Sequence, residues 1–170
     1  MRLLTGMKLL TVLMGVAGAA LGAGCSQKAA PGLGLGNEGP VEPGSAREFA
    51  VKVGDTIHFE SDSVQLTSEG QQILSAQAQW LKSYPQYTVT LEGHADERGT
   101  REYNIGLGAQ RAGAAMKYLV QQGVPAGRLR TLSYGKERPV ATCDDISCWS
   151  QNRRSVTALN NRGGAPVATN

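Results

Sequence analysis

The residues best suited to binding a ligand lie in one stretch, Gly93 to Ala112, which reads GHADERGTREYNIGLGAQRA. Asp96 follows an alternating apolar run and is expected in a polar loop at the end of a strand. Arg111 comes later, where the spacing of apolar residues becomes helical. A carboxylate that accepts from an ammonium group and a guanidinium that donates to a carboxylate would together bind a small zwitterion. The alternative for Asp96 and Arg111 is a purely structural ion pair, which is common in proteins.

Two predicted elements would position these charges. Apolar residues alternate with polar ones over 87–93, which predicts a half-buried strand that leads into the polar loop. A helix is predicted over about 103–122. Asn104, Leu107 and Arg111 follow one another at i, i+3 and i+7, so they share one face of this helix. Arg111 is therefore expected on a rigid element that faces the loop.

The stretch from Gly93 to Ala112, with the later segments SYGKERPV and QNRRSV, closely resembles the core motifs of the OmpA-like peptidoglycan-binding domain family. The resemblance extends over roughly Val53 to Leu159 and is greatest to the lipoprotein members of the family. It implies that Asp96 and Arg111 hold the zwitterionic end of diaminopimelate in the stem peptide of the cell wall. The resemblance therefore favours the ligand site over the structural ion pair.

The same resemblance implies a wider peptidoglycan-binding site around these two charges. It would take side chains from the helix and the loop, and backbone near two further residues: Asn104, Leu107, Arg98, Asp62 and His94. The family has an aromatic residue before the aspartate that matches Asp62 and a lysine after it. Ser61 and Ser63 occupy these two positions here, so Asp62 departs from the family pattern in its surroundings.

The remaining pattern predicts an α/β sandwich with the order βαβαββ, the arrangement of the OmpA-like family. A first helix is expected to begin after Thr67, a good N-cap residue, and to end before Pro85. We expect two helices on one face of a mixed sheet, with the last two strands forming a hairpin-like return. The predicted strands lie at 55–60, 87–93, 129–134 and 154–159.

Cys143 and Cys148 enclose the short segment CDDISC between the last two predicted strands. In an exported protein, two cysteines this close most often form a disulfide. The alternative is a zinc site that uses both thiols with Asp144 or Asp145, but the usual second pair of ligands is missing. The pair is foreign to the common pattern of the family. We expect the disulfide to shape the loop near Trp149.

The N-terminus has the three zones of an export signal over residues 1–24: basic residues, an apolar run and small residues. Cys25 follows directly and resembles the lipidated cysteine of a bacterial lipobox, although Gly22 stands where leucine is usual. The alternative is ordinary cleavage near Ala23 that leaves Cys25 as a free thiol. Many bacteria retain a lipoprotein in the inner membrane by an aspartate after this cysteine. Ser26 therefore implies transport to the outer membrane.

The rest of the chain divides by composition. Residues 25–47 comprise the expected acylated N-terminus and a flexible linker rich in Gly, Pro and Ala, which could not form a core. Residues 48–160 form the expected OmpA-like domain. The tail over 161–170 has no periodicity, and we expect it to be disordered.

Charge and composition argue against several classes of function. The formal net charge is +3, and removal of Arg2 and Lys8 with the signal leaves +1, which is too little for an electrostatic nucleic-acid binder. We expect Arg153 and Arg154 on a solvated or locally paired face. The chain has two histidines, no His-x-x-x-His pattern and no recognisable nucleophile. We therefore expect no metal, no cofactor and no enzymatic activity.

The expected function is a lipid-anchored clamp that fastens the outer membrane to peptidoglycan. The resemblance further implies TolB and the inner-membrane Tol proteins as partners in envelope integrity and cell division, with the domain facing the periplasm. One alternative is an OmpA-like lipoprotein that binds the wall without Tol partners. Another is an envelope interaction protein in which Asp96 and Arg111 only pair with each other.

Overall fold

The computed structural model describes residues 41–161, which belong to one compact unit. The expected signal peptide, Cys25, most of the linker and the tail from residue 162 lie outside the described residues. Within the described part of the chain, no helix has the length and apolar character needed to cross a membrane.

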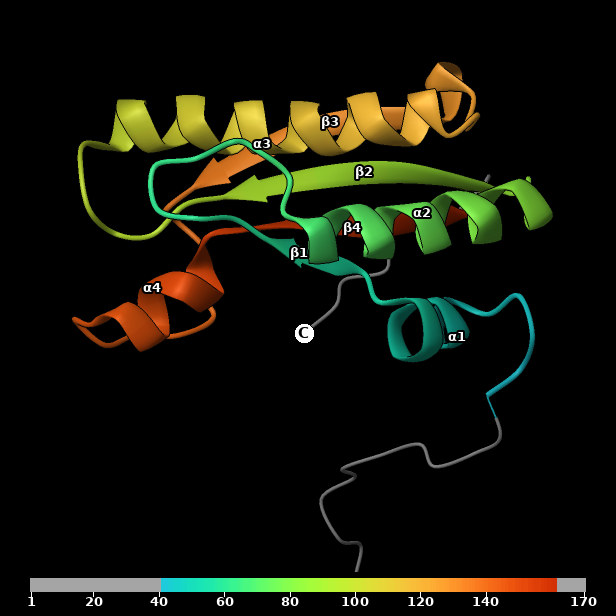
Figure 1. The fold of residues 1–170 in the computed structure, drawn as a ribbon, viewed down its shortest axis with the longest axis horizontal. Coiled ribbons are helices and arrows are strands. Elements are labelled where there is room, and N and C mark those ends of the chain that lie inside the picture. The colour runs from blue at the N-terminus through green and yellow to red at the C-terminus, as the bar shows by residue number, and fades with distance from the viewer. Residues whose placement is uncertain (1–40, 162–170) are drawn as a thin grey trace, which may run out of the picture. The chain divides into compact units, whose positions relative to one another are not determined.

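A four-stranded mixed sheet forms the centre of the fold, in the order β1-β4-β2-β3 (Figure 1). β2 and β3 are parallel, and β4 is antiparallel to both β1 and β2. The prediction of an α/β fold with a mixed sheet is confirmed. The strands are β1 Thr56–His58, β2 Tyr87–His94, β3 Leu129–Gly135 and β4 Arg154–Asn161.

The predicted hairpin-like return of the last two strands is wrong, because β3 and β4 are not neighbours. The helical crossover from β2 places β3 parallel to it at the edge of the sheet, and β4 enters between β1 and β2. The connection over 136–153 is far longer than a hairpin loop of about two to five residues. It contains a short helix, α4 Ile146–Asn152, that the sequence pattern did not indicate.

Two long helices, α2 Ser68–Ser83 and α3 Arg101–Gln121, cover one face of the sheet. Each begins at a threonine whose hydroxyl accepts a backbone N–H, because the first N–H groups of a helix have no partner within it. Thr67 accepts from Gly70 at 3.0 Å, and Thr100 accepts from Tyr103 at 3.2 Å. The predicted helices therefore exist, with the predicted cap at Thr67.

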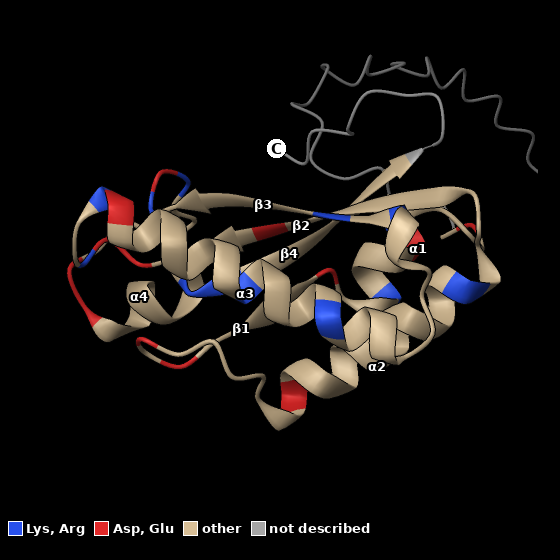
Figure 2. Cartoon of the chain, turned by 90° about the horizontal axis from the view of Figure 1, so that it is seen from above, with Lys and Arg blue, Asp and Glu red and all other residues tan. Residues whose placement is uncertain are grey.

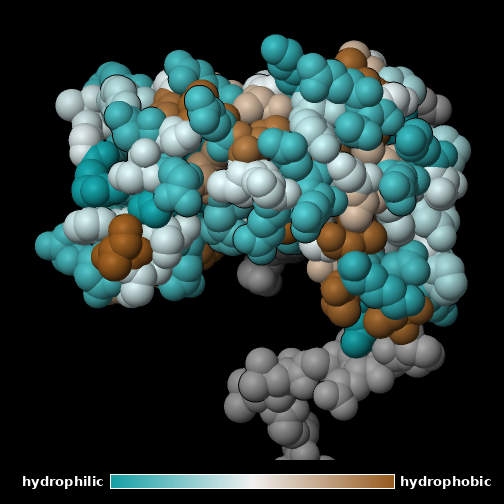
Figure 3. All heavy atoms as spheres, in the orientation of Figure 1, coloured by the Kyte–Doolittle hydropathy of each residue, from teal (hydrophilic) through white to brown (hydrophobic). Residues whose placement is uncertain are grey.

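The hydrophobic core lies between these two helices and the sheet. Its central residues come from both helices and the middle of β2, and each is at most 1% exposed: Leu74, Leu81, Leu119, Val89 and Leu91. On the outer surface, Figure 3 shows mostly hydrophilic residues on the face that it displays, with hydrophobic patches over the regions of α1 and α4. The most exposed large hydrophobic residues are Val51 and Ile146.

Ordered structure begins before the predicted domain start at residue 48. The short helix α1 Ala46–Glu48 continues into a π-helix, Phe49–Val53, and Phe49 packs on Trp80 with ring centroids 4.9 Å apart. The Tyr87 hydroxyl donates to the carbonyl of Gly44 at 2.8 Å. The end of the expected linker is therefore attached to the core. A 3₁₀ turn, Ala126–Arg128, precedes β3.

Helix α3 approaches β2 most closely where two glycines face each other. A Cβ atom placed on Gly93 would overlap the carbonyl group of Gly108. One placed on Gly108 would lie 2.8 Å from the carbonyl oxygen of Gly93. By contrast, a Cβ on Gly106 or Gly113 would have no neighbour within 4 Å. Of these four glycines, Gly93 and Gly108 are the two that the close contact between α3 and β2 requires.

We therefore expect Gly93→Ala and Gly108→Ala to lower the free energy of unfolding by about 1 to 3 kcal/mol each, because overpacking forces the backbones apart. Gly106→Ala and Gly113→Ala are matched controls in the same helix. They should raise stability by up to about 1 kcal/mol through helix propensity. Urea unfolding monitored by circular dichroism measures all four. Wild-type stability of Gly93→Ala would contradict the close approach.

Candidate functional site

A pocket of about 350 Å³ lies at the end of the fold where β2 leads into α3. Three segments line it: the loop after β1, the loop after β2 and the first turns of α3. Figure 2 shows charged residues of both signs at the end of the fold where α3 begins. The lining residues are Ser61, Asp62, Asp96, Arg98, Gly99, Tyr103, Asn104 and Leu107.

The carboxylate of Asp96 is the most strongly hydrogen-bonded acid of this pocket. Its Oδ1 accepts from the Arg98 backbone at 3.2 Å and from Arg98 Nε at 3.0 Å, and its Oδ2 accepts from Arg98 Nη2 at 2.7 Å. Burial acts to raise the pKa of Asp96, but the hydrogen bonds and charge of Arg98 outweigh this and lower the pKa. Asp96 is therefore ionised at neutral pH, although it is 7% exposed.

Arg98 is the cation that lines the pocket. Besides its bidentate contact with Asp96, Arg98 donates from Nη2 to the Ser61 hydroxyl at 2.9 Å. Its guanidinium lies 4.2 Å from the ring centroid of Trp149. The side chain is 44% exposed. Within residues 41–161, no acceptor is recorded for its third nitrogen, Nη1. Arg98 can therefore donate to a ligand while it remains in place.

Arg111 is fully buried and is not among the lining residues. Its nitrogens donate to three backbone carbonyls: Ser63 at 2.9 Å, His94 at 2.9 Å and Glu60 at 3.3 Å. Burial lowers the pKa of Arg111 to about 10, and the nearby charge of Asp96 acts in the opposite direction. Arg111 thus remains charged at neutral pH. It joins the loop after β1 to the end of β2, and among the described residues it forms no ion pair with Asp96.

His94 also lies outside the lining of the pocket. Its ring is 2% exposed, lies 5.4 Å from the Tyr134 ring, and has no hydrogen-bond partner within the described residues. Burial and the charges of two arginines lower the pKa of His94 to about 3, so the ring is neutral at physiological pH. The contribution of His94 to the site is its carbonyl, which accepts from Arg111.

The other predicted residues line the pocket. Asn104 is 1% exposed and donates from Nδ2 to the carbonyl of Arg98 at 2.8 Å, which holds the loop against α3. Asp62 has a φ of +52°, a left-handed conformation that aspartate adopts more readily than most residues. Its carboxylate accepts a hydrogen bond from the Tyr103 hydroxyl. The structure therefore brings together Asp62, Asp96, Arg98, Asn104 and Leu107.

Arg153 is a residue of the site that sequence reasoning placed wrongly. It was expected on a solvated or locally paired face, but it is 4% exposed. Its Nε donates to the carbonyl of Phe59 at 3.0 Å, and its Nη1 lies 3.5 Å from Asp96 Oδ2. Arg154 is also buried. Arg154 begins the inner strand β4, and Arg153 directly before it pairs with Phe59 next to β1. The resemblance of QNRRSV to a family motif was the signal that could have indicated this.

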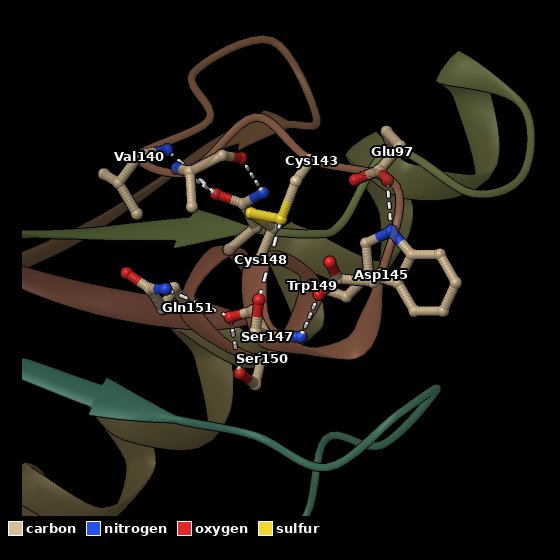
Figure 4. Close-up of a disulfide and its surroundings, with 11 residues drawn as sticks. Glu97, Val140, Cys143, Asp145, Ser147, Cys148, Trp149, Ser150 and Gln151 are labelled. Carbon is tan, nitrogen blue, oxygen red and sulfur yellow. Dashed lines mark hydrogen bonds between the residues drawn. A yellow bond between two sulfur atoms is a disulfide. The ribbon is translucent and has the colours of Figure 1, made fainter.

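The disulfide loop borders the same end of the sheet. Cys143 and Cys148 form a disulfide with their Cα atoms 5.6 Å apart (Figure 4). Asp145 caps α4 by accepting from the backbone of Ser147 at 2.7 Å. Within residues 41–161, no group of three or more potential ligands could hold a metal ion. The alternative of a zinc site with Asp144 or Asp145 therefore has no support in the described structure.

Comparison with known proteins gives consistent matches. The OmpA family matches residues 58–153. The peptidoglycan-associated lipoprotein of Agrobacterium fabrum is 58% identical over 146 residues, which cover 83% of this chain and 82% of that protein. The crystal structure of the peptidoglycan-associated lipoprotein from Burkholderia pseudomallei has a TM-score of 0.61 at 40% identity, and covers 62% of this chain and 90% of that one. The C-terminal domain of Helicobacter pylori MotB shares the fold, with a TM-score of 0.60 at 24% identity over 64% of this chain and 86% of that one.

The burial of Arg111 predicts a large effect on stability. Arg111→Lys should lower the free energy of unfolding by about 2 to 4 kcal/mol, because one ammonium group cannot replace a guanidinium that serves three buried carbonyls. Arg101→Lys is the matched control, since Arg101 is exposed and pairs with exposed Glu137. It should change stability by less than about 0.5 kcal/mol. Equal effects of the two substitutions in urea unfolding would contradict the structural role.

The buried neutral ring of His94 predicts a dependence of stability on pH. The pKa of His94 is about 3 in the folded chain and about 6.5 when unfolded, so between these values the unfolded chain binds an extra proton. Stability is therefore lost as the pH falls through this window. Between pH 6 and 4, wild type should lose roughly 2 kcal/mol more than His94→Phe, which cannot titrate there. Parallel stability profiles for the two proteins would show that His94 does not contribute.

Proposed function

The chain belongs to the OmpA family, among the peptidoglycan-associated lipoproteins, and we propose from this premise that its pocket binds the stem peptide of peptidoglycan without catalysis. The protein is not an enzyme. Binding would fasten a membrane-anchored protein to the cell wall. The observation that carries the proposal is the presence of an ionised carboxylate and a half-exposed guanidinium side by side, on Asp96 and Arg98, in the lining of one pocket.

The proposed ligand is the zwitterionic end of diaminopimelate. Its ammonium group would donate to Asp96, which has acceptor sites beyond those that Arg98 uses. Its carboxylate would accept from Arg98 Nη1, with the buried charge of Arg111 adding to the positive potential. Asn104 and Leu107 would support the stem from α3, and Asp62 would form the rim. Each charge-assisted hydrogen bond contributes about 1.5 to 3 kcal/mol. Modest affinity would suffice, because the wall presents many copies of the ligand.

We further propose that acylated Cys25 anchors the protein in the outer membrane with the folded domain in the periplasm. A linker of roughly twenty residues reaches about 25 Å as a flexible chain, which would let the domain leave the membrane surface. From the family resemblance of the motifs we also propose a role in the Tol–Pal system, with TolB and the inner-membrane Tol proteins as partners in envelope integrity and cell division. Co-purification with TolB tests this part. Its failure beside intact wall binding would favour a lipoprotein without Tol partners.

The wall-binding proposal predicts that binding weakens when the negative charge of Asp96 is removed. Asp96→Asn should weaken binding of a diaminopimelate-containing muropeptide by at least about 10-fold, because the amide keeps the shape of the carboxylate but loses its charge. Glu102→Gln removes the same charge from an exposed position in the first turn of α3 and should bind like wild type. Calorimetric titration measures both. Wild-type affinity of Asp96→Asn would overturn the proposed site.

A further inference from the structure

We propose that Trp149 is a positioning residue for the pocket: it holds Arg98 in place and so lets the site distinguish a zwitterionic ligand end from a simple ammonium end. Trp149 lies on α4, outside the segments that line the pocket. The positioning role concerns the unliganded protein. The discrimination rests on the proposed function, because it requires a stem peptide to bind beside Asp96.

Trp149 makes two contacts with consecutive residues of the pocket loop. The Arg98 guanidinium lies over the Trp149 ring, 4.2 Å from its centroid. The indole N–H of Trp149 donates to the carboxylate of Glu97, as Figure 4 shows. A cation over the face of a tryptophan is attracted by the negative face of the ring. The hydrogen bond fixes the plane of that ring relative to the loop. Together they place a flat surface under one face of Arg98.

The helix that presents Trp149 is braced on both sides. It has seven residues, too few for a stable isolated helix, so its position depends on its attachments. The disulfide of Cys143 with Cys148 closes the turn before it. At its other end, buried Asn152 accepts from the backbone of Val140 at 2.8 Å and donates to the carbonyl of Ala141 at 2.8 Å. The ring of Trp149 is therefore a fixed feature of this end of the fold.

The contact matters most once a ligand is bound. In the unliganded protein, Asp96 and Ser61 hold Arg98 by its Nε and Nη2 atoms. A ligand ammonium group would compete with Arg98 for the oxygens of Asp96, which weakens that hold. The Trp149 ring is not part of this competition, so it keeps the 44%-exposed side chain in position. Arg98 Nη1 then remains directed at the ligand carboxylate.

This arrangement predicts which ligands depend on Trp149. A diaminopimelate end carries a carboxylate beside its ammonium group, and it would use both Asp96 and Arg98. A lysine end carries the ammonium group alone and would use only Asp96. Loss of the ring should therefore weaken binding of the first ligand and leave the second unchanged. A substitution that merely loosened the fold would weaken both alike.

The first measurement uses the unliganded full 170-residue chain in detergent micelles, labelled with ¹⁵N-arginine. Trp149→Leu should shift the Nε–H signal of Arg98 and speed its exchange with water, because the ring no longer covers the guanidinium. Trp149→Phe should retain most of the wild-type behaviour. Ile146→Ala is the matched control, since Ile146 is exposed on the same helix. An unchanged Arg98 signal in Trp149→Leu, or an equal change in Ile146→Ala, would overturn the positioning role.

The second measurement compares the dissociation constants of two muropeptides that differ only in diaminopimelate or lysine at the third position. Trp149→Leu should reduce the preference for diaminopimelate by about 2- to 5-fold, which is the strength of an exposed cation–π contact. Trp149→Phe should preserve most of the preference. An unchanged ratio in Trp149→Leu would overturn the role in discrimination, even if the Arg98 signal had moved.

Two further outcomes separate the parts of the proposal. If the folded wild type binds neither muropeptide, the proposed function fails and the discrimination fails with it, while the Arg98 signal still decides whether Trp149 positions that side chain. The Cys143→Ser/Cys148→Ser double variant tests whether the disulfide helps to hold α4, and with it Trp149, in position. It should shift the Arg98 signal in the same direction as Trp149→Leu, and an unshifted signal would overturn the contribution of the disulfide.

Discussion

The buried guanidinium of Arg111 is the interaction on which the geometry of the site depends. It is bonded to three backbone carbonyls that belong to two segments far apart in the chain, the loop after β1 and the end of β2. Without it, three carbonyls at this end of the sheet would lose a buried partner, which is costly in a protein interior. The positions of Asp62 and Asp96 follow from these two segments. The residue type of Arg111 suggested a ligand contact, but its main role in the structure is to support the pocket.

Charges of both signs surround this support. Asp62, Asp96 and Arg98 line the pocket, and the guanidinium groups of Arg111 and Arg153 lie behind it. A site with both signs of charge would favour a ligand that also carries both, because an unpaired charge would be partly desolvated without compensation. On this electrostatic ground, the proposed zwitterion would suit the pocket better than a simple cation. The positive charges also explain why Asp96 stays ionised although it is almost buried.

Local signals predicted the elements of the fold, and the parts that failed depend on distant contacts. Helix α3 and the cap at Thr67 follow from apolar spacing and side-chain chemistry within a few residues. The position of β4 between β1 and β2 does not, because it is decided by which strand edges remain free after the crossover. Arg153, directly before β4, is buried where that strand enters the sheet beside β1. The shared helix face of Asn104, Leu107 and Arg111 was visible in the spacing, but the carbonyl partners of Arg111 lie 17 to 51 residues away.

The connection between β3 and β4 is held in place by other interactions than those of the hydrophobic core. The apolar cluster between α2, α3 and the sheet draws on no residue of α4, so changes in that helix need not disturb the hydrophobic core. The disulfide and the bonds of Asn152 give the connection a fixed shape of its own. Through Trp149 it reaches Glu97 and Arg98, the two residues that follow Asp96. A separately braced segment can therefore adjust how the site receives a ligand carboxylate, while Arg111 and the core keep Asp96 where an ammonium group would bind.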